Sequence, residues 1–290
     1  MQTPLLAVVP AFLIAAAVLV ALTRPWLKGA AMMRPAWGGA LALALAFITA
    51  DCLIWHSRPM LWSVEEQRRL WIVAVGAVVA AALNAVLKDK VVSTWRAWVA
   101  GAVLMLPLVW SDATRAGAYP PFAVRWLLYA GAAAILWAEN AAAAKRVPGI
   151  RVPLVLTIAA AGAGLTIIQS SSASIGFMAI GLASATGAFI ALAIWRPSIP
   201  AIVGAMPVFA ALFAGLFVGA LYGGVDIRLW SFIFAICASA TPAIGGRGPL
   251  AKVKPWMATL VCVILTCALI ALAIWNTPKG FDFSVGGPGA

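Results

Sequence analysis

Two carboxylates, Asp51 and Glu139, are the side chains whose type and position best suit the binding of a proton or a cation. Each lies near the end of a long apolar segment, and the middle of these segments contains no lysine or arginine. Because ionisable residues within a bilayer mark proton and ion pathways, either residue is a candidate ionisable site. The position near a segment end also suits a solvated carboxylate at the membrane surface, and we expect that environment for both residues.

Pro207 lies in the middle of an apolar segment and is the centre of a candidate substrate path. A proline within a helix removes one backbone hydrogen bond, and transporters place their binding sites at interrupted helices near the bilayer midplane. The polar side chains on other segments that could line this path are Asn84, Thr166, Gln169 and Ser184. Such groups are also often satisfied by hydrogen bonds within their own helix, so both interpretations stay open.

Small residues recur at every fourth position on two apolar segments, and this spacing favours close contact between helices. One series contains Ala183 and Gly187, and the other contains Ala211, Gly215, Gly219 and Gly223. In lipid, van der Waals packing between such faces replaces the hydrophobic effect as the force that brings helices together. We expect these helix-packing faces to meet other helices of the same chain, and the alternative is contact with another membrane subunit.

The sequence lacks the residue combinations that familiar catalytic and cofactor sites need. Its one histidine, His56, is too few for a bis-histidine haem site or an H-E-x-x-H zinc site. The four cysteines form no C-x-x-C pair, and neither a G-x-S-x-G motif nor a glycine-rich nucleotide-binding motif occurs. We therefore predict no catalytic residue, no cofactor and no metal, and an enzyme is the least favoured class of function.

The elements that must position these residues are helices within a membrane. Of the 290 residues, 64% are hydrophobic and 10% are charged, whereas charged residues make up about a quarter of an ordinary soluble domain. This composition excludes a soluble domain, a disordered chain and a secreted disulfide scaffold. The net charge of +12 comes from basic residues between the apolar segments, which indicates topology signals and lipid contacts and no nucleic-acid binding.

Ten apolar segments approach the length of about 20 residues that a membrane span needs. We place them at residues 5–23, 36–55, 70–87, 95–111, 122–140, 152–169, 175–195, 198–222, 228–245 and 256–275. The predicted fold is an all-α integral membrane protein, a single bundle of about ten transmembrane helices with short loops. Residues 1–275 form this bundle, and the Gly- and Pro-rich residues 276–290 form a flexible C-terminal tail.

The basic residues also predict an orientation. If the connections alternate between the two sides of the membrane, 13 of the 20 Lys and Arg residues fall on the side of the first connection and 7 fall on the other side. Cytoplasmic loops carry the excess of Lys and Arg, so both termini are predicted to lie outside, and we expect a bacterial inner (cytoplasmic) membrane. No small-residue cleavage site precedes Arg24, so the first segment is expected to stay in the mature chain.

Two functions from different classes fit these features. The first is a secondary transporter or permease for a small, weakly charged or apolar solute, because interrupted and closely packed helices suit moving parts. The alternative is a non-catalytic structural or accessory subunit of a larger membrane protein complex, which the scarcity of buried charge and the small-residue faces favour. The expected partners are the lipid bilayer and, under the alternative, other membrane subunits.

Overall fold

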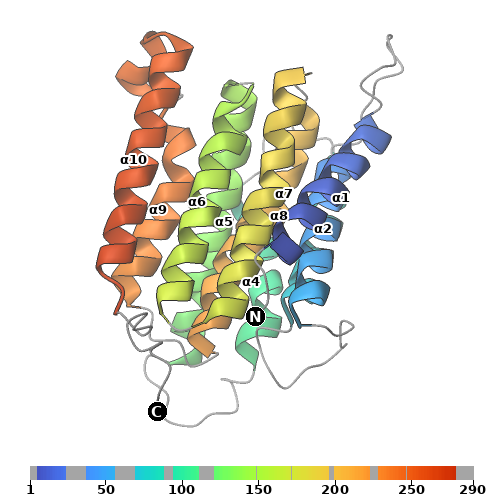
Figure 1. Cartoon of the computed structure of the whole chain (residues 1–290), viewed down its shortest axis with the longest axis vertical. Helices are drawn as coiled ribbons and strands as arrows, with labels where there is room; N and C mark the ends of the chain where they lie inside the picture. The colour runs from blue at the N-terminus through green and yellow to red at the C-terminus, as the bar shows by residue number, and fades with distance from the viewer. Residues whose placement is uncertain are drawn as a thin grey trace, which may run out of the picture.

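The residues that the computed structural model describes contain ten α-helices, which stand side by side (Figure 1). The structure describes residues 5–23, 37–55, 69–87, 94–110, 121–147, 149–170, 172–195, 199–222, 228–245 and 247–278. Among these residues there is no strand. The prediction of an all-α fold is therefore confirmed.

The helices follow the apolar segments closely. They are α1 Leu5–Thr23, α2 Trp37–Trp55, α3 Leu70–Val86, α4 Thr94–Val109, α5 Phe122–Arg146, α6 Arg151–Gln169, α7 Ala173–Trp195, α8 Ile199–Tyr222, α9 Leu229–Ile244 and α10 Pro255–Trp275, and a short 3₁₀ helix, η3, covers Gly248–Lys252. In lipid, a helix is the way for an isolated apolar segment to satisfy every backbone N–H and C=O group internally. Apolar length therefore dictates where each helix runs.

Within the described ranges, six helices are long and apolar enough to cross a membrane, namely α2, α5, α6, α7, α8 and α10. The apolar parts of α1, α3, α4 and α9 are shorter, at 10–17 residues. A 16-residue helix is about 24 Å long, against a hydrocarbon core of about 30 Å. The structure is thus compatible with a polytopic membrane protein that has six candidate spans, and a total of ten spans stays a prediction.

The largest difference from the predicted boundaries is at the end of α5. The sequence predicts a helix over 122–140, but the helix continues to Arg146. Its extension consists of four alanines followed by Lys145 and Arg146. Alanine is the best helix former, and basic side chains stabilise the last turn of a helix, so the helix continues past the apolar segment. Gly149, with φ of +114°, then supplies the left-handed turn that leads to α6.

Helix α8 occupies the centre of the bundle. It contacts α2, α3, α4, α5, α6 and α7, and 94% of its most apolar stretch is buried inside the bundle. Phe209, Phe213 and Phe217 follow one another along it, the first two rings stacked with centroids 5.3 Å apart and the last two tilted with centroids 5.8 Å apart. The helix continues through Pro207, which is buried within it. A helix that is apolar all round must be surrounded by other helices or by lipid, and here helices surround it.

The peripheral helices pack against one another around this centre. Helix α1 packs against α2 and α7, α4 packs against α5, and α10 packs against α6 and α9. The indole nitrogen of Trp126 on α5 donates to the carbonyl of Ala102 on α4 at 2.8 Å, and the hydroxyls of Thr241 on α9 and Thr266 on α10 lie 2.6 Å apart. Successive helices alternate in direction, so α1 begins and α10 ends at the same end of the bundle (Figure 1).

Glycines allow the closest approaches between helices. A Cβ added to Gly39 on α2 would overlap the carbonyl oxygen of Ala201 on α8. A Cβ on either Gly164 of α6 or Gly176 of α7 would lie 2.8 Å from the carbonyl oxygen of the other. These two helix pairs therefore meet backbone to backbone, which is the geometry that small residues permit in lipid.

Candidate binding groove

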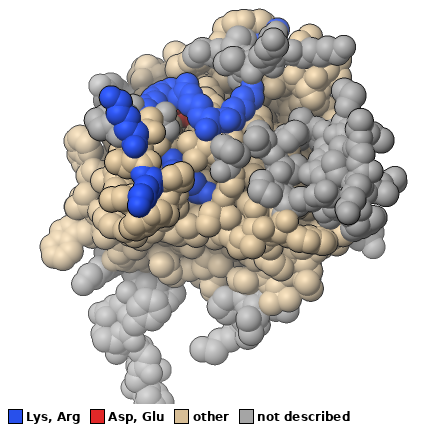
Figure 2. Space-filling model, turned by 90° about the horizontal axis from the view of Figure 1, so that it is seen from above, with Lys and Arg blue, Asp and Glu red and all other residues tan. Residues whose placement is uncertain are grey.

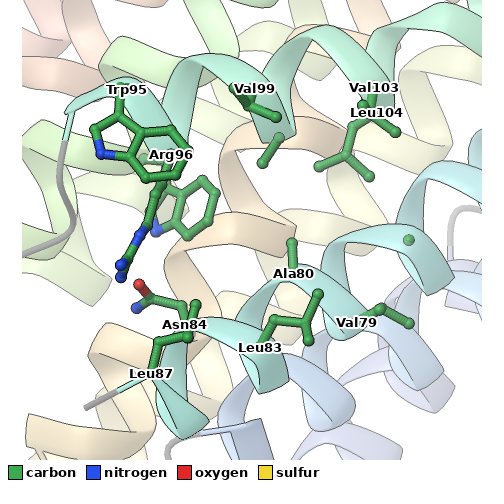
Figure 3. Close-up of a pocket in the computed structure, with 13 residues that line it drawn as sticks. Val79, Ala80, Leu83, Asn84, Leu87, Trp95, Arg96, Val99, Val103 and Leu104 are labelled. Atoms are coloured by element: carbon green, nitrogen blue, oxygen red, sulfur yellow. The ribbon is translucent and has the colours of Figure 1, made fainter. Parts of the chain in front are cut away.

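An apolar groove of about 440 Å³ lies between α3 and α4 (Figure 3). It is lined by α3 between Gly76 and Leu87, by α4 between Trp95 and Leu104, and by Trp137 of α5. Small-molecule sites in proteins usually enclose about 300–1,000 Å³ and are mostly apolar with a few polar groups, so the groove has the size and lining of a ligand site.

The groove exists because its two walls are anchored on different neighbours. Helix α3 packs mainly against α2 and α8, whereas α4 packs mainly against α5. The walls come together at one end, where a Cβ on Gly76 would lie 2.7 Å from a methyl group of Leu104. The small side chains of Ala80 and Ala100 leave the space open farther along, toward Leu87 and Trp95.

The groove opens sideways, away from the core of the bundle. Val79 and Leu83 of α3 are 53% and 57% exposed, and Val99 of α4 is 54% exposed. If the bundle is embedded in a membrane, these exposed apolar side chains face acyl chains.

Two polar side chains, Asn84 of α3 and Arg96 of α4, lie at the wider end of the groove. They point toward one another across it (Figure 3). The Oδ1 of Asn84 is buried and has no hydrogen-bond partner within the part of the chain that the structure describes. The guanidinium of Arg96 lies 5.4 Å from the ring centre of Trp95, within the range of a cation–π contact. One end of an otherwise apolar space thus presents a cation and an amide.

The same end of the bundle carries most of the described positive charge (Figure 2). The exposed basic residues there are Lys145 and Arg146 at the end of α5, and Arg247, Lys252 and Lys254 between α9 and α10. Glu139 forms an ion pair with Arg247 at 3.0 Å. This is the end at which α1, α3, α5, α7 and α9 finish, as the alternation of helix direction requires (Figure 1).

Of the five residues in the predicted substrate path, Asn84 alone lines the groove. The Thr166 hydroxyl on α6 donates to Gly162 of its own helix at 2.9 Å, and the Ser184 hydroxyl on α7 donates to Val8 of α1 at 2.5 Å. Gln169 is partly exposed at the end of α6, and Pro207 is buried in α8. The structure therefore does not bring the five residues together. Beside Pro207, residues of α2, α6, α7 and α8 enclose an apolar space of about 10 Å³.

The two candidate ionisable residues lie at opposite ends of the bundle. Asp51 is near the end of α2 and Glu139 is near the end of α5, and these two helices end on opposite sides (Figure 1). Asp51 is 6% exposed, so the expectation of a solvated carboxylate is wrong for this residue. Glu139 is partly exposed and paired with Arg247. The pair cannot act as one site across this separation.

The small-residue faces have different surroundings. Gly215 of α8 is approached by Leu70 and Leu108, which would lie 2.9 and 3.1 Å from an added Cβ, and Ala211 and Gly219 are buried beside it. Ala183 of α7 is buried too, but a Cβ on Gly187 would meet nothing within 4 Å.

Gly223, His56 and the tail from residue 279 onward lie outside the described residues. The start of the tail is inside them, and there the Thr277 hydroxyl donates to the Ser231 hydroxyl at 3.0 Å.

Sequence reasoning missed the roles of Arg96 and Arg151. From the sequence, both are assigned to the connections between apolar segments. In the structure, Arg96 lines the groove, and Arg151 is 4% exposed and makes three hydrogen bonds. Each lies in the first turn of a helix, where a topology signal and a structural arginine look alike in sequence.

The described residues contain no group of three His, Cys, Asp or Glu side chains that could hold a metal ion.

Comparison with known proteins adds no family to this description. Neither protein-family models, nor curated proteins, nor solved structures match the chain.

Proposed function

We propose that this protein is a membrane permease for a small apolar or amphipathic solute that enters the groove between α3 and α4 from the bilayer. The observation that carries the proposal is the groove itself, an apolar space of about 440 Å³ that opens sideways and has Arg96 and Asn84 at one end. A polar solute would need a water-filled route through the bundle, whereas an apolar solute can partition into the bilayer first.

The arrangement of the helices supports movement at this groove. Helix α4 packs mainly against α5 and less against α8 than α3 does, so a movement of α4 disturbs the central helix less than a movement of α3 would. Pro107 lies inside α4, toward the end at which the two groove walls meet. A proline within a helix marks a point where the helix bends, because one backbone hydrogen bond is missing. Helix α4 is thus the wall of the groove that is best suited to move.

An efflux assay in which the solute is not chosen in advance tests this proposal. Purified protein is reconstituted into liposomes loaded with a small-molecule extract of cells, and mass spectrometry identifies the solutes that leave. Ala80→Trp places a bulky ring in the groove, and we expect it to slow the protein-dependent efflux by about tenfold, because the ring occupies the space that the solute would enter. Val75→Trp is the matched control, since Val75 is 45% exposed on the same helix and does not line the groove.

The control variant should release the same solutes within about twofold of the wild-type rate, as expected for a change at an exposed site that makes no special contact. The proposal fails if no solute leaves faster than from protein-free liposomes. It also fails if the two tryptophan variants behave alike.

The second candidate function is that of an accessory subunit in a larger membrane complex. The observation that favours it is the outer surface of α7, where a Cβ on Gly187 would meet nothing within 4 Å and Ala191 is exposed. A helix of another subunit could approach such a surface closely. Gentle purification followed by native mass spectrometry separates the two candidates, because a monomer that transports solute contradicts the subunit role.

A further inference from the structure

We propose that the occupant of the groove is an anionic phospholipid, with one acyl chain between α3 and α4 and its phosphate group held by Arg96 and Asn84. This inference goes beyond the proposed transport of small solutes, because binding of the lipid in the same groove can be tested without transport.

The length of the groove matches one leaflet of a bilayer. Its α3 wall runs from Gly76 to Leu87, and at a rise of 1.5 Å per residue this is about 16 Å. The hydrocarbon core of a bilayer is about 30 Å thick, so one leaflet contributes about half of that. A groove of this length, open on its flank and closed at the Gly76 end, accommodates an acyl chain that reaches the middle of the bilayer.

The polar end of the groove lies where a lipid headgroup would be. Arg96 lies in the first turn of α4, and Asn84 lies in the last turn of α3. Trp95 is 63% exposed beside them, and indole rings favour the level of the headgroups. The apolar walls therefore face acyl chains, and the cation and the amide face the phosphate region.

The chemistry of this end selects an anion. A guanidinium presents a planar fork of N–H donors that matches two oxygens of a phosphate group. The N–H groups in the first turn of α4 add a partial positive charge at the same place. The amide of Asn84 supplies a further donor, and its buried Oδ1 can accept a hydrogen bond from a hydroxyl of the headgroup. A glycerol-type headgroup offers both the phosphate oxygens and such hydroxyls.

The surrounding surface favours the same lipid. The exposed basic residues at this end of the bundle (Lys145, Arg146, Arg247, Lys252 and Lys254) face the leaflet that would supply the occupant (Figure 2). Basic pockets between transmembrane helices bind anionic headgroups, and each nearby Lys or Arg attracts the anionic surface of a membrane. The local concentration of anionic lipid around the groove is raised accordingly.

The spacing of the two walls argues against a helix of another protein as the occupant. Helices α3 and α4 contact one another directly. A helix with its side chains is about 10 Å across, so it could only rest on the rim of the groove, whereas an extended acyl chain is narrower.

Native mass spectrometry with defined lipids tests the inference. The full chain is mixed with phosphatidylglycerol and phosphatidylcholine that carry the same acyl chains, and bound lipid is counted after the detergent is removed. We expect wild type to prefer phosphatidylglycerol. In Arg96→Gln this preference should fall by about tenfold, because the charge-assisted hydrogen bonds to the phosphate are lost. Arg228→Gln removes an equal charge from an exposed position at the opposite end of the bundle and should keep the preference.

Two further variants keep the test decisive. Ala80→Trp should lower the binding of both phospholipids, because it blocks the chain and leaves the headgroup site intact. Arg96→Lys keeps the charge and loses the planar fork, so it should fall between wild type and Arg96→Gln, and it replaces Arg96→Gln if that variant does not fold. Oleate competes as a free carboxylate without a glycerol headgroup, and it should displace phosphatidylglycerol poorly.

The inference is overturned if wild type binds the two phospholipids equally, if Arg96→Gln and Arg228→Gln have the same effect, or if oleate binds in preference to phosphatidylglycerol. Its failure is distinguishable from failure of the permease. Phosphatidylglycerol binding without any protein-dependent efflux removes the permease and keeps the lipid site. Efflux of an uncharged solute that Ala80→Trp blocks, without any preference between the two phospholipids, keeps the permease and removes the lipid site.

Discussion

Arg151 shows how one buried side chain can hold several helices at one end of the bundle. Its Nε donates to the Thr259 hydroxyl at 3.0 Å, and its terminal nitrogens donate to the carbonyls of Gly245 and Pro255 at 2.9 and 2.8 Å. These bonds join the start of α6 to the end of α9 and the start of α10. Gly245 leaves room for the guanidinium, since an added Cβ would lie 2.9 Å from one of its nitrogens.

We expect Arg151→Lys to lower the free energy of unfolding by about 2 kcal/mol, because a lysine cannot satisfy three acceptors in this planar arrangement and leaves buried carbonyls unpaired. Unfolding by SDS, followed by circular dichroism in mixed micelles, measures this. Arg146→Lys, at an exposed position of the same end, should change the stability by less than about 0.5 kcal/mol. Equal losses for the two variants would show that the hydrogen bonds of Arg151 do not stabilise the fold.

At the scale of helices, the contact between α2 and α8 depends on the absence of a side chain at Gly39. The carbonyl oxygen of Ala201 occupies the place where a Cβ would be. That oxygen belongs to the backbone of the most buried helix, so it cannot rotate away as a side chain could. A residue larger than glycine must therefore push the two helices apart along their whole contact.

Gly39→Ala should destabilise the protein by about 1–3 kcal/mol or prevent its folding, because the extra methyl group overpacks this contact. Thermal unfolding in detergent provides the measurement. Gly187→Ala, within α7, is the matched control, because nothing lies within 4 Å of its added Cβ. We expect the midpoint temperature of its thermal unfolding to be unchanged or slightly raised. A similar loss of stability in both variants would show that the close contact between α2 and α8 at Gly39 does not stabilise the fold.

At the scale of the whole molecule, the alternation of helix direction brings the ends of the odd-numbered helices to one side. That end carries most of the described basic residues, and the opposite end carries Arg69, Arg125 and Arg228. If the basic end faces the cytoplasm, as the excess of Lys and Arg there predicts, the start of α1 and the end of α10 face the outside.

Cysteine accessibility in cells tests this orientation. In a chain whose four native cysteines are replaced by alanine, Arg228→Cys should react with a membrane-impermeant maleimide in intact cells. Lys252→Cys should react only after the cells are permeabilised, because both side chains are exposed but lie at opposite ends of the bundle. The opposite labelling pattern would reverse the orientation, and labelling of both in intact cells would refute the membrane topology.

The positions of the helices could be predicted because each depends on local sequence. The segment expected at 5–23 is helix α1 from Leu5 to Thr23, and the boundaries of the other helices agree within a few residues except at the end of α5. The candidate site could not be predicted in the same way. Asn84 is expected to share a path with Pro207, but it faces Arg96 across the groove between α3 and α4.

By itself, the sequence determined an all-helical bundle whose basic residues gather mainly at one end, because apolar length and the placement of charge act within each segment. The tertiary structure alone decided which polar residues meet. Arg96, Arg151 and Asp51 all lie near helix ends in sequence, yet the first lines a groove and the other two are buried. The physical reason is that contact in lipid depends on the fit between side chains of helices that are far apart in sequence, and no local pattern records that fit.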